Sequence, residues 1–246
     1  MKSTKPYSII LKSLFLIVSL LGIIFLGINI PTFQTTFLYF EVWANLFAFI
    51  FTLVSLILEI KGNKYQSPTF HIFRIILLLS LTILPIIYYP IIAPNERLFN
   101  FLSLPNLFLK LFSPLLFFLD YLFFDNKKSF KISQVTTWLT LPILYVATSY
   151  ILALLKVRIY VNYDPIDTSN FAYFFLNQDL IGLGNVCLWI LGIGAGLLAL
   201  SLIFFIIDHT VPLQPSWFTA TKEERKNKSY IEKEPEIIVN MGLPKE

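Results

Sequence analysis

The most regular feature of the chain is a series of long apolar runs separated by short polar stretches. A helix needs about 20 mostly apolar residues to cross the hydrocarbon core of a bilayer, and six runs have this length. They cover residues of about 8–30, 36–60, 70–90, 104–124, 135–156 and 181–207. The pattern predicts an all-α fold, a polytopic membrane bundle of six transmembrane helices forming one domain over residues 1–207.

Composition agrees with this assignment. The chain is 56% hydrophobic and 14% charged, whereas a soluble domain has about 45–50% apolar and about 25% charged residues. The first run follows basic residues, as in a signal peptide, but it is longer than a signal sequence and no small-x-small cleavage site follows it. We therefore interpret it as a retained first helix.

Prolines mark where the helices are expected to end or bend. Three of them lie inside the predicted spans, namely Pro85, Pro114 and Pro142. They should kink these spans, while neighbouring helices satisfy the freed carbonyl groups. Four more lie near the span ends, outside helix interiors: Pro31, Pro90, Pro94 and Pro105.

The placement of Lys and Arg predicts the orientation, because cytoplasmic loops carry an excess of both. Of the 19 basic residues, one side would carry 15: Lys2, Lys5, Lys12, Lys61, Lys64, Arg74, Lys127, Lys128, Lys131, Lys222, Arg225, Lys226, Lys228, Lys233 and Lys245. The other side would carry Arg97, Lys156 and Arg158. Both termini are therefore predicted to be cytoplasmic. The high Phe and low Gly content (25 and 9 residues) favours a low-GC bacterial source, hence a bacterial plasma membrane.

Two polar segments lie outside the spans. Residues 208–246 are rich in mixed charge and poor in apolar residues, which predicts a disordered cytoplasmic tail; contact of its basic residues with anionic lipid is the alternative. The external connection 157–180 is rich in aromatic residues and contains three Asp. It is either an interfacial loop or a lid over a site that opens outward.

Charged residues inside a span are costly, so they usually face the bundle interior and are paired. Glu41 lies roughly 7–8 Å into span 2 and Lys110 roughly 9 Å into span 4, at 1.5 Å per residue. Both spans run inward, so the two charges lie at the same depth. We expect a Glu41–Lys110 ion pair, which acts as structural glue between helices, as a polar floor for a head group, or as a proton acceptor and donor.

Span 2 carries further polar residues in nearly the same direction as Glu41. Asn45 lies one turn later, and Thr52 and Glu59 return close to that direction. This polar stripe should face the bundle interior. Asp120 lies near the cytoplasmic end of span 4, at a depth similar to that of Arg74 and Lys131, and a structural pair is favoured there over a site.

Span 6 contains Gly192 and Gly196, four residues apart, a spacing that allows close helix approach. Its expected use is inside the bundle or at a homo-oligomer contact. The chain has one Cys and two His, too few for a usual metal site, and no nucleotide, hydrolase or nucleic-acid motif is present. We predict no metal, no cofactor and no nucleic-acid partner; the expected partners are membrane lipids.

The order of the polar residues resembles the Pr-six-Pr family of prokaryotic six-helix membrane proteins, related to the androgen-induced membrane proteins of animals. The similar positions run through spans 2 to 6: Tyr39, Phe40, Glu41 and Asn45; Lys110, Pro114, Asp120 and Tyr121; Trp138, Leu139, Pro142 and Tyr145; and Tyr173, Phe174, Phe175, Leu176, Asn177 and Gly182. The resemblance implies a shared polar core that includes Tyr145.

The animal relatives hydrolyse fatty-acid esters of hydroxy fatty acids with a threonine in span 2 and a histidine in span 4. The resemblance places Glu41 and Lys110 at these two positions, so both catalytic residue types are replaced. An ion-paired carboxylate and ammonium do not form the hydroxyl–imidazole pair that cleaves esters.

Three functional interpretations follow. The leading one is a non-hydrolytic membrane protein that binds lipid or has a structural role. The second is a membrane lipid-ester hydrolase in which Glu41 activates water, with Glu41 and Lys110 as the catalytic candidates. The third is a small transporter or transporter subunit, which suits the kinking prolines and the intramembrane pair but lacks an inverted repeat.

Overall fold

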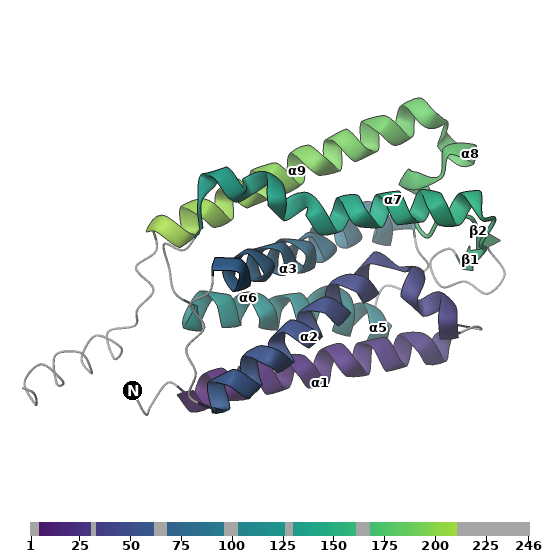
Figure 1. The fold of residues 1–246 in the computed structure, drawn as a ribbon. Helices are drawn as coiled ribbons and strands as arrows, with labels where there is room; N and C mark the ends of the chain where they lie inside the picture. Colours follow the sequence, from purple (N-terminus) through teal and green to yellow (C-terminus); the bar gives the residue numbers. More distant parts are fainter. Residues whose placement is uncertain are drawn as a thin grey trace, which may run out of the picture.

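Six long apolar helices make up most of the structure, which is a computed structural model (Figure 1). It describes residues 5–30, 33–61, 68–95, 103–125, 130–160 and 168–210. The six stretches long and apolar enough to cross a membrane are Pro6–Asn29, Phe40–Ile60, Thr69–Ile92, Leu104–Phe124, Ile132–Leu154 and Leu183–Thr210. The prediction of six apolar helices is confirmed, and the chain is compatible with a multi-pass membrane protein.

Three of these stretches are single α-helices: α1 (Lys5–Asn29), α2 (Phe40–Ile60) and α9 (Leu183–Thr210). The other three change helix type along their length. α3 (Pro68–Ile87) continues into the π-helical η2 (Tyr88–Ile92) and the short 3-10 turn η3 (Ala93–Asn95). α5 (Leu104–Leu107), the π-helical η4 (Phe108–Phe112) and α6 (Ser113–Phe124) form the fourth. The 3-10 helix η5 (Ile132–Leu139) leads into α7 (Thr140–Leu154).

The expected kink positions lie close to these changes. Pro85 lies inside α3 shortly before η2, and Pro114 lies in the first turn of α6 directly after η4. Pro142 lies in the first turn of α7, directly after η5. Proline lacks the N–H that continues an α-helix, so a local change of hydrogen-bond pattern next to it is the expected response.

Two predicted boundaries are wrong. Span 2 does not begin at residue 36, because Phe33–Leu38 is a separate 3-10 helix, η1, and Tyr39 is extended before α2 begins at Phe40. The predicted tail does not begin at residue 208, because α9 continues to Thr210. The rest of the predicted tail, residues 211–246, lies outside the described residues.

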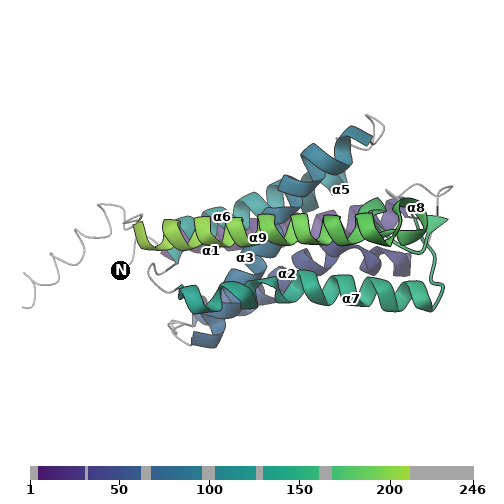
Figure 2. The same cartoon turned by 90° about the horizontal axis from the view of Figure 1, so that it is seen from above.

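α3 occupies the middle of the bundle. α1 packs on α2 and α6, these two helices pack on α3, and α7 and α9 lie on the other side of α3 (Figure 1). α9 contacts η5 near one end of the bundle. In the view of Figure 1, α7 and α9 diverge toward the end that carries α8 (Gln178–Ile181), while in Figure 2 they run nearly parallel. α3 is the most enclosed of the six spans and α9 the least.

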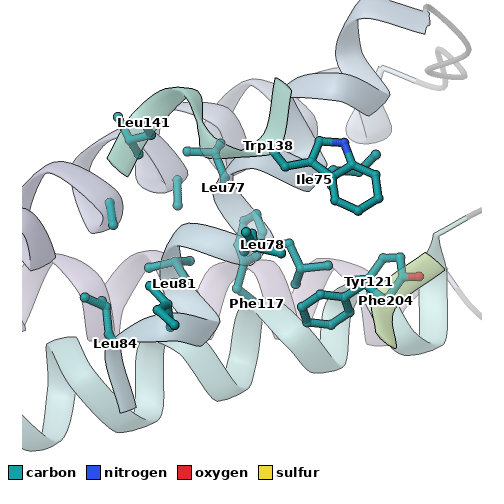
Figure 3. Close-up of a cluster of buried hydrophobic side chains, with 14 of the residues drawn as sticks. Ile75, Leu77, Leu78, Leu81, Leu84, Phe117, Tyr121, Trp138, Leu141 and Phe204 are labelled. Carbon is teal, nitrogen blue, oxygen red and sulfur yellow. The ribbon is translucent and has the colours of Figure 1, made fainter. Parts of the chain in front are cut away.

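The largest apolar cluster surrounds α3 (Figure 3). Leu78 and Leu81 of α3 meet Phe117 of α6, Trp138 of η5 and Phe204 of α9, and all five are buried. In a bilayer, where lipid tails are as apolar as these side chains, close packing and not the hydrophobic effect would hold such a core together.

The connection between α7 and α9 folds back over one end of the bundle. Its described parts are the two-residue strands β1 (Ile159–Tyr160) and β2 (Thr168–Ser169), which pair antiparallel, and the 3-10 turn η7 (Phe174–Leu176). Phe171, Phe175 and Leu176 are buried against α3, η2 and α7. The aromatic residues of this predicted external loop therefore cover the bundle end and do not lie beside it.

Glycine has different roles in α1 and α9. A Cβ at Gly22 would lie 2.7 Å from Leu109 Cδ2 and 3.0 Å from Phe108 Cβ, so Gly22 lets η4 approach α1 closely. A Cβ at Gly192 or Gly196 would meet nothing within 4 Å among the described residues, and both glycines are exposed. This favours a homo-oligomer contact over use inside the bundle, and the packing role of both glycines stays a prediction.

The contrast between these glycines gives a stability prediction. Gly22→Val should cost roughly 1–3 kcal/mol, the usual penalty for inserting carbon atoms into a packed core, and should lower the melting temperature of the detergent-solubilised protein. Gly192→Val is the matched control, and its effect should stay within about 0.5 kcal/mol. Equal melting temperatures for the two variants would contradict the close approach of α1 and η4.

Candidate polar site and cavity

Glu41 and Lys110 form the ion pair expected from their depths. Glu41 lies in the first turn of α2, where the helix dipole favours a negative charge, and Lys110 lies in η4. Lys110 Nζ is 3.3 Å from Glu41 Oε1, and the two side chains are 6% and 1% exposed. The predicted pair is confirmed, and it links the second and fourth spans.

Two tyrosines complete the surroundings of the pair. The Tyr173 hydroxyl donates to Glu41 Oε2, so each carboxylate oxygen has a donor. Burial first, and then the Glu41 carboxylate, raise the pKa of Tyr173 well above its usual range. Tyr173 is therefore a neutral phenol, and so a donor, at neutral pH. On the other side, Lys110 Nζ lies 3.9 Å from the ring centre of Tyr88, a cation–π contact.

The pair lies at the wall of a cavity of about 360 Å³. The cavity is bounded by α2, α3, η2, η4, η5, α7 and α9, together with the segment around η7. Most of its lining is apolar, and Glu41 and Lys110 are the two charged residues among the described residues that line it. The site is thus an apolar chamber with one polar end. That end carries one positive and one negative side chain, so its net charge is zero.

Tyr145 lines the same cavity from α7. Its hydroxyl donates to the Leu38 carbonyl at 2.9 Å, and its ring meets Phe40, Trp43 and Tyr173 at centroid distances of 5.2, 5.7 and 6.0 Å. Tyr145 therefore fixes the start of α2, which carries Glu41, against α7.

Asn45 does not line the cavity but supports the pair from behind. Ser113 N–H donates to the Phe108 carbonyl, five residues back, and Pro114 has no N–H. Neither residue therefore donates an N–H to the Leu109 carbonyl in the way a regular α-helix would. The Leu109 carbonyl accepts instead from Asn45 Nδ2 at 3.1 Å. Asn45 Nδ2 also donates to the Glu41 carbonyl at 2.8 Å, and Asn45 Oδ1 accepts from the Ser113 hydroxyl.

Both functional groups of the Asn45 amide are thus engaged in a site that is fully buried. The amide bridges the start of α2 and the π-helical turn that presents Lys110. A polar side chain in hydrocarbon needs such partners, and Asn45 uses them to set the distance between the two charged residues.

Asp120 belongs to a second network at the opposite end of the bundle. Arg74 Nη2 lies 2.5 Å from Asp120 Oδ2, as the sequence led us to expect, and Lys12 Nζ lies 2.9 Å from Asp120 Oδ1. Lys12 also lies 3.1 Å from Glu59, and Arg74 Nε lies 2.8 Å from Asp125. Lys131, proposed as a neighbour of Asp120, is exposed.

This second network joins α1, α2, α3 and α6 and lies ten residues along the fourth span from Lys110, roughly 15 Å at the helical rise. Asp120 is therefore not part of the Glu41 site. Of the predicted polar stripe, Glu41 and Asn45 belong to the first site, Thr52 is buried between the two, and Glu59 belongs to the second network.

Sequence reasoning missed three partners. Tyr173 lies in a connection and gives no periodic signal; only the family resemblance includes it. Lys12 was counted as a flanking cytoplasmic charge, yet it is 7% exposed. Asp208 was assigned to the tail, yet it is fully buried and accepts from Phe130 N at 3.1 Å and from the Tyr121 hydroxyl at 3.3 Å.

Comparisons with protein families, curated proteins and solved structures find no match for the chain.

The separation of the two networks gives a second prediction. Asp120→Asn leaves Arg74 and Lys12 without their shared carboxylate and should lower the free energy of unfolding by about 3–5 kcal/mol, the usual cost of breaking a buried pair. Asp179→Asn, at an exposed position in α8, is the control and should change it little. A drop of similar size in both variants would contradict the structural role of Asp120.

Proposed function

We propose that this protein is a membrane-embedded receptor for a single-chain amphiphile, whose chain occupies the cavity and whose head group meets Glu41 and Lys110. The observation that carries the proposal is the combination of an almost wholly apolar chamber with one polar end. Ligand sites in proteins commonly have this composition, apolar walls with a few polar groups that fix orientation.

The size of the chamber favours one acyl chain. At roughly 30 Å³ for each water-sized group, a volume of about 360 Å³ takes about a dozen heavy atoms. A single medium-length chain of about 12 carbon atoms fills that space and leaves its head group at the polar end, whereas a diacyl phospholipid is several times too large.

Entry from the bilayer, between α7 and α9, is the route that fits best. Residues of both helices line the cavity, and one of them, Ile143, is 61% exposed. The opposite route, through the bundle end, is covered by Tyr173, Phe175 and Leu176. A ligand already dissolved in the membrane would thus enter chain and head together.

The position of the ion pair favours binding over helix glue alone, because the pair lines the cavity as well as joining two spans. It does not favour hydrolysis. Neither position that the family resemblance makes catalytic carries a hydroxyl or an imidazole, and a carboxylate that accepts from an ammonium and a phenol is a weak general base. Membership of the Pr-six-Pr family is part of this proposal.

We also propose that the protein resides in a bacterial plasma membrane with both termini in the cytoplasm. The support is the distribution of Lys and Arg along the sequence. In this orientation the ion pair lies in the outer half of the bilayer, and the Asp120 network lies near the cytoplasmic face.

The proposal predicts that filling the chamber abolishes binding. Gly194 lines the cavity, and a Cβ there would meet nothing within 4 Å. Gly194→Phe should therefore place a ring in open space, leave stability unchanged and reduce binding of tritiated monolauroylglycerol at least about tenfold. Binding is measured by scintillation proximity on protein in nanodiscs.

Gly196→Phe is the matched control, since residues two apart on a helix face nearly opposite directions and Gly196 is absent from the cavity lining. It should bind like the wild type. Equal binding by wild type, Gly194→Phe and Gly196→Phe would overturn the proposed chamber. Release of free laurate by the wild type, lost in Glu41→Gln and Lys110→Gln, would replace the receptor with a hydrolase.

A further inference from the structure

We infer that the ligand of this cavity carries an uncharged head group, a hydroxyl or an ester carbonyl, and not an ionised one. The inference rests on the proposed function and specifies the chemistry of the same site. Its basis is the charge balance of the cavity lining together with the hydrogen-bond partners of the four polar side chains at its polar end.

The cavity lining has no net charge. Glu41 and Lys110 carry opposite charges 3.3 Å apart, and no other charged residue is among the described residues that line the cavity. The lining is thus neutral overall. An ionised head group would bring a net charge into a site whose own charges already compensate each other.

An ionised head group would also separate the buried ion pair. An anionic head would have to compete with Glu41 for Lys110, and a cationic head would have to compete with Lys110 for Glu41. Either competition leaves one buried charge without its partner, which is strongly unfavourable away from water. The covering segment with Tyr173, Phe175 and Leu176 restricts the water that could otherwise solvate that charge.

The ion pair can form hydrogen bonds with an uncharged head group. An ammonium has three N–H donors and a carboxylate accepts at about four positions. A hydroxyl beside the pair can accept from Lys110 and donate to Glu41 while the ion pair persists. An ester carbonyl can likewise accept a hydrogen bond from Lys110 while the ion pair persists.

The neighbouring hydroxyl groups do not change this balance. Tyr173 donates to Glu41 and Tyr145 donates to the Leu38 carbonyl, while Tyr88 presents its ring face to Lys110 and its hydroxyl accepts from Asn106 at 2.7 Å. Among the described residues that line the cavity, the charged groups that face a head group are therefore those of the pair itself. The site selects a head that neither adds nor removes charge.

A ligand panel with one chain length tests the inference on the wild-type protein in nanodiscs. The competitors are monolauroylglycerol, dodecanesulfonate and dodecyltrimethylammonium, each displacing tritiated monolauroylglycerol. The sulfonate and the quaternary ammonium keep their charges at every pH used. We expect the uncharged glyceride to bind at least about tenfold more tightly than each of the other two. Tighter binding of either charged competitor overturns the inference.

Charge-swapped variants provide the second measurement. In Glu41→Gln the lining keeps Lys110 alone, so dodecanesulfonate should become the tightest competitor. In Lys110→Gln the lining keeps Glu41 alone, so dodecyltrimethylammonium should become the tightest. A merely structural pair predicts weaker binding of all heads alike and no exchange of preference.

The control is Glu59→Gln, a loss of one carboxylate at the opposite end of the bundle and outside the cavity lining. It should retain the wild-type order of competitors. If the single variants at the pair fail to fold, as judged by size-exclusion chromatography, the wild-type panel decides alone.

The outcomes separate this inference from the proposed function. Loss of binding in Gly194→Phe together with equal affinity for all three heads leaves the receptor intact and refutes the uncharged head. Absence of saturable binding by the wild type for every competitor refutes the receptor itself, and the inference with it.

Discussion

The structure depends on one constraint: each buried charge and each buried backbone carbonyl released from a helix needs a partner from the chain itself. The Glu41 carboxylate, Lys110 ammonium and Leu109 carbonyl are satisfied together, by one another, by Tyr173 and by Asn45. At the other end, Asp120 is satisfied by Arg74 and Lys12. The Glu41 network and the Asp120 network join the spans. They fix how far each span is shifted along its neighbours, which apolar packing alone would not determine.

The same constraint explains how a cavity persists beside an ion pair. α1, α2, α3 and α6 are joined by the Asp120 network, and the second and fourth spans are joined again by the Glu41–Lys110 pair, so these helices form one body. α7 and α9 are joined to that body by aromatic contacts, by Asp208 at one end and by the η7 segment at the other. Their divergence toward the η7 end leaves the chamber between the two groups of helices. The polar end of the chamber is therefore on the wall that the two networks join.

Sequence reasoning predicted those features that depend on depth and period. The six apolar spans follow from length and composition, and the Glu41–Lys110 and Arg74–Asp120 pairs follow from helical rise and alternating direction. It could not predict Tyr173, because a connection has no period that relates its residues to a helix face. It misplaced Lys12 and Asp208, because a charge near a span end looks alike whether it is solvated or buried.

The cavity itself was also beyond sequence reasoning. It depends on how far α7 and α9 diverge, and nothing in their apolar residues encodes that distance. The glycines of α9 illustrate the limit: Gly192 and Gly196 have the spacing of a packing motif, but a Cβ at either would meet no described residue within 4 Å, whereas the isolated Gly22 admits η4. Spacing shows where close approach is allowed, and only the fold shows where it occurs.

Native mass spectrometry of the protein released from lipid nanodiscs tests the central claim most directly. The account predicts one bound molecule per chain, with the mass of a single-chain, uncharged amphiphile, that persists at collision energies which strip the surrounding lipid. A chain that emerges without any bound molecule, or with variable numbers of diacyl phospholipids only, would contradict it.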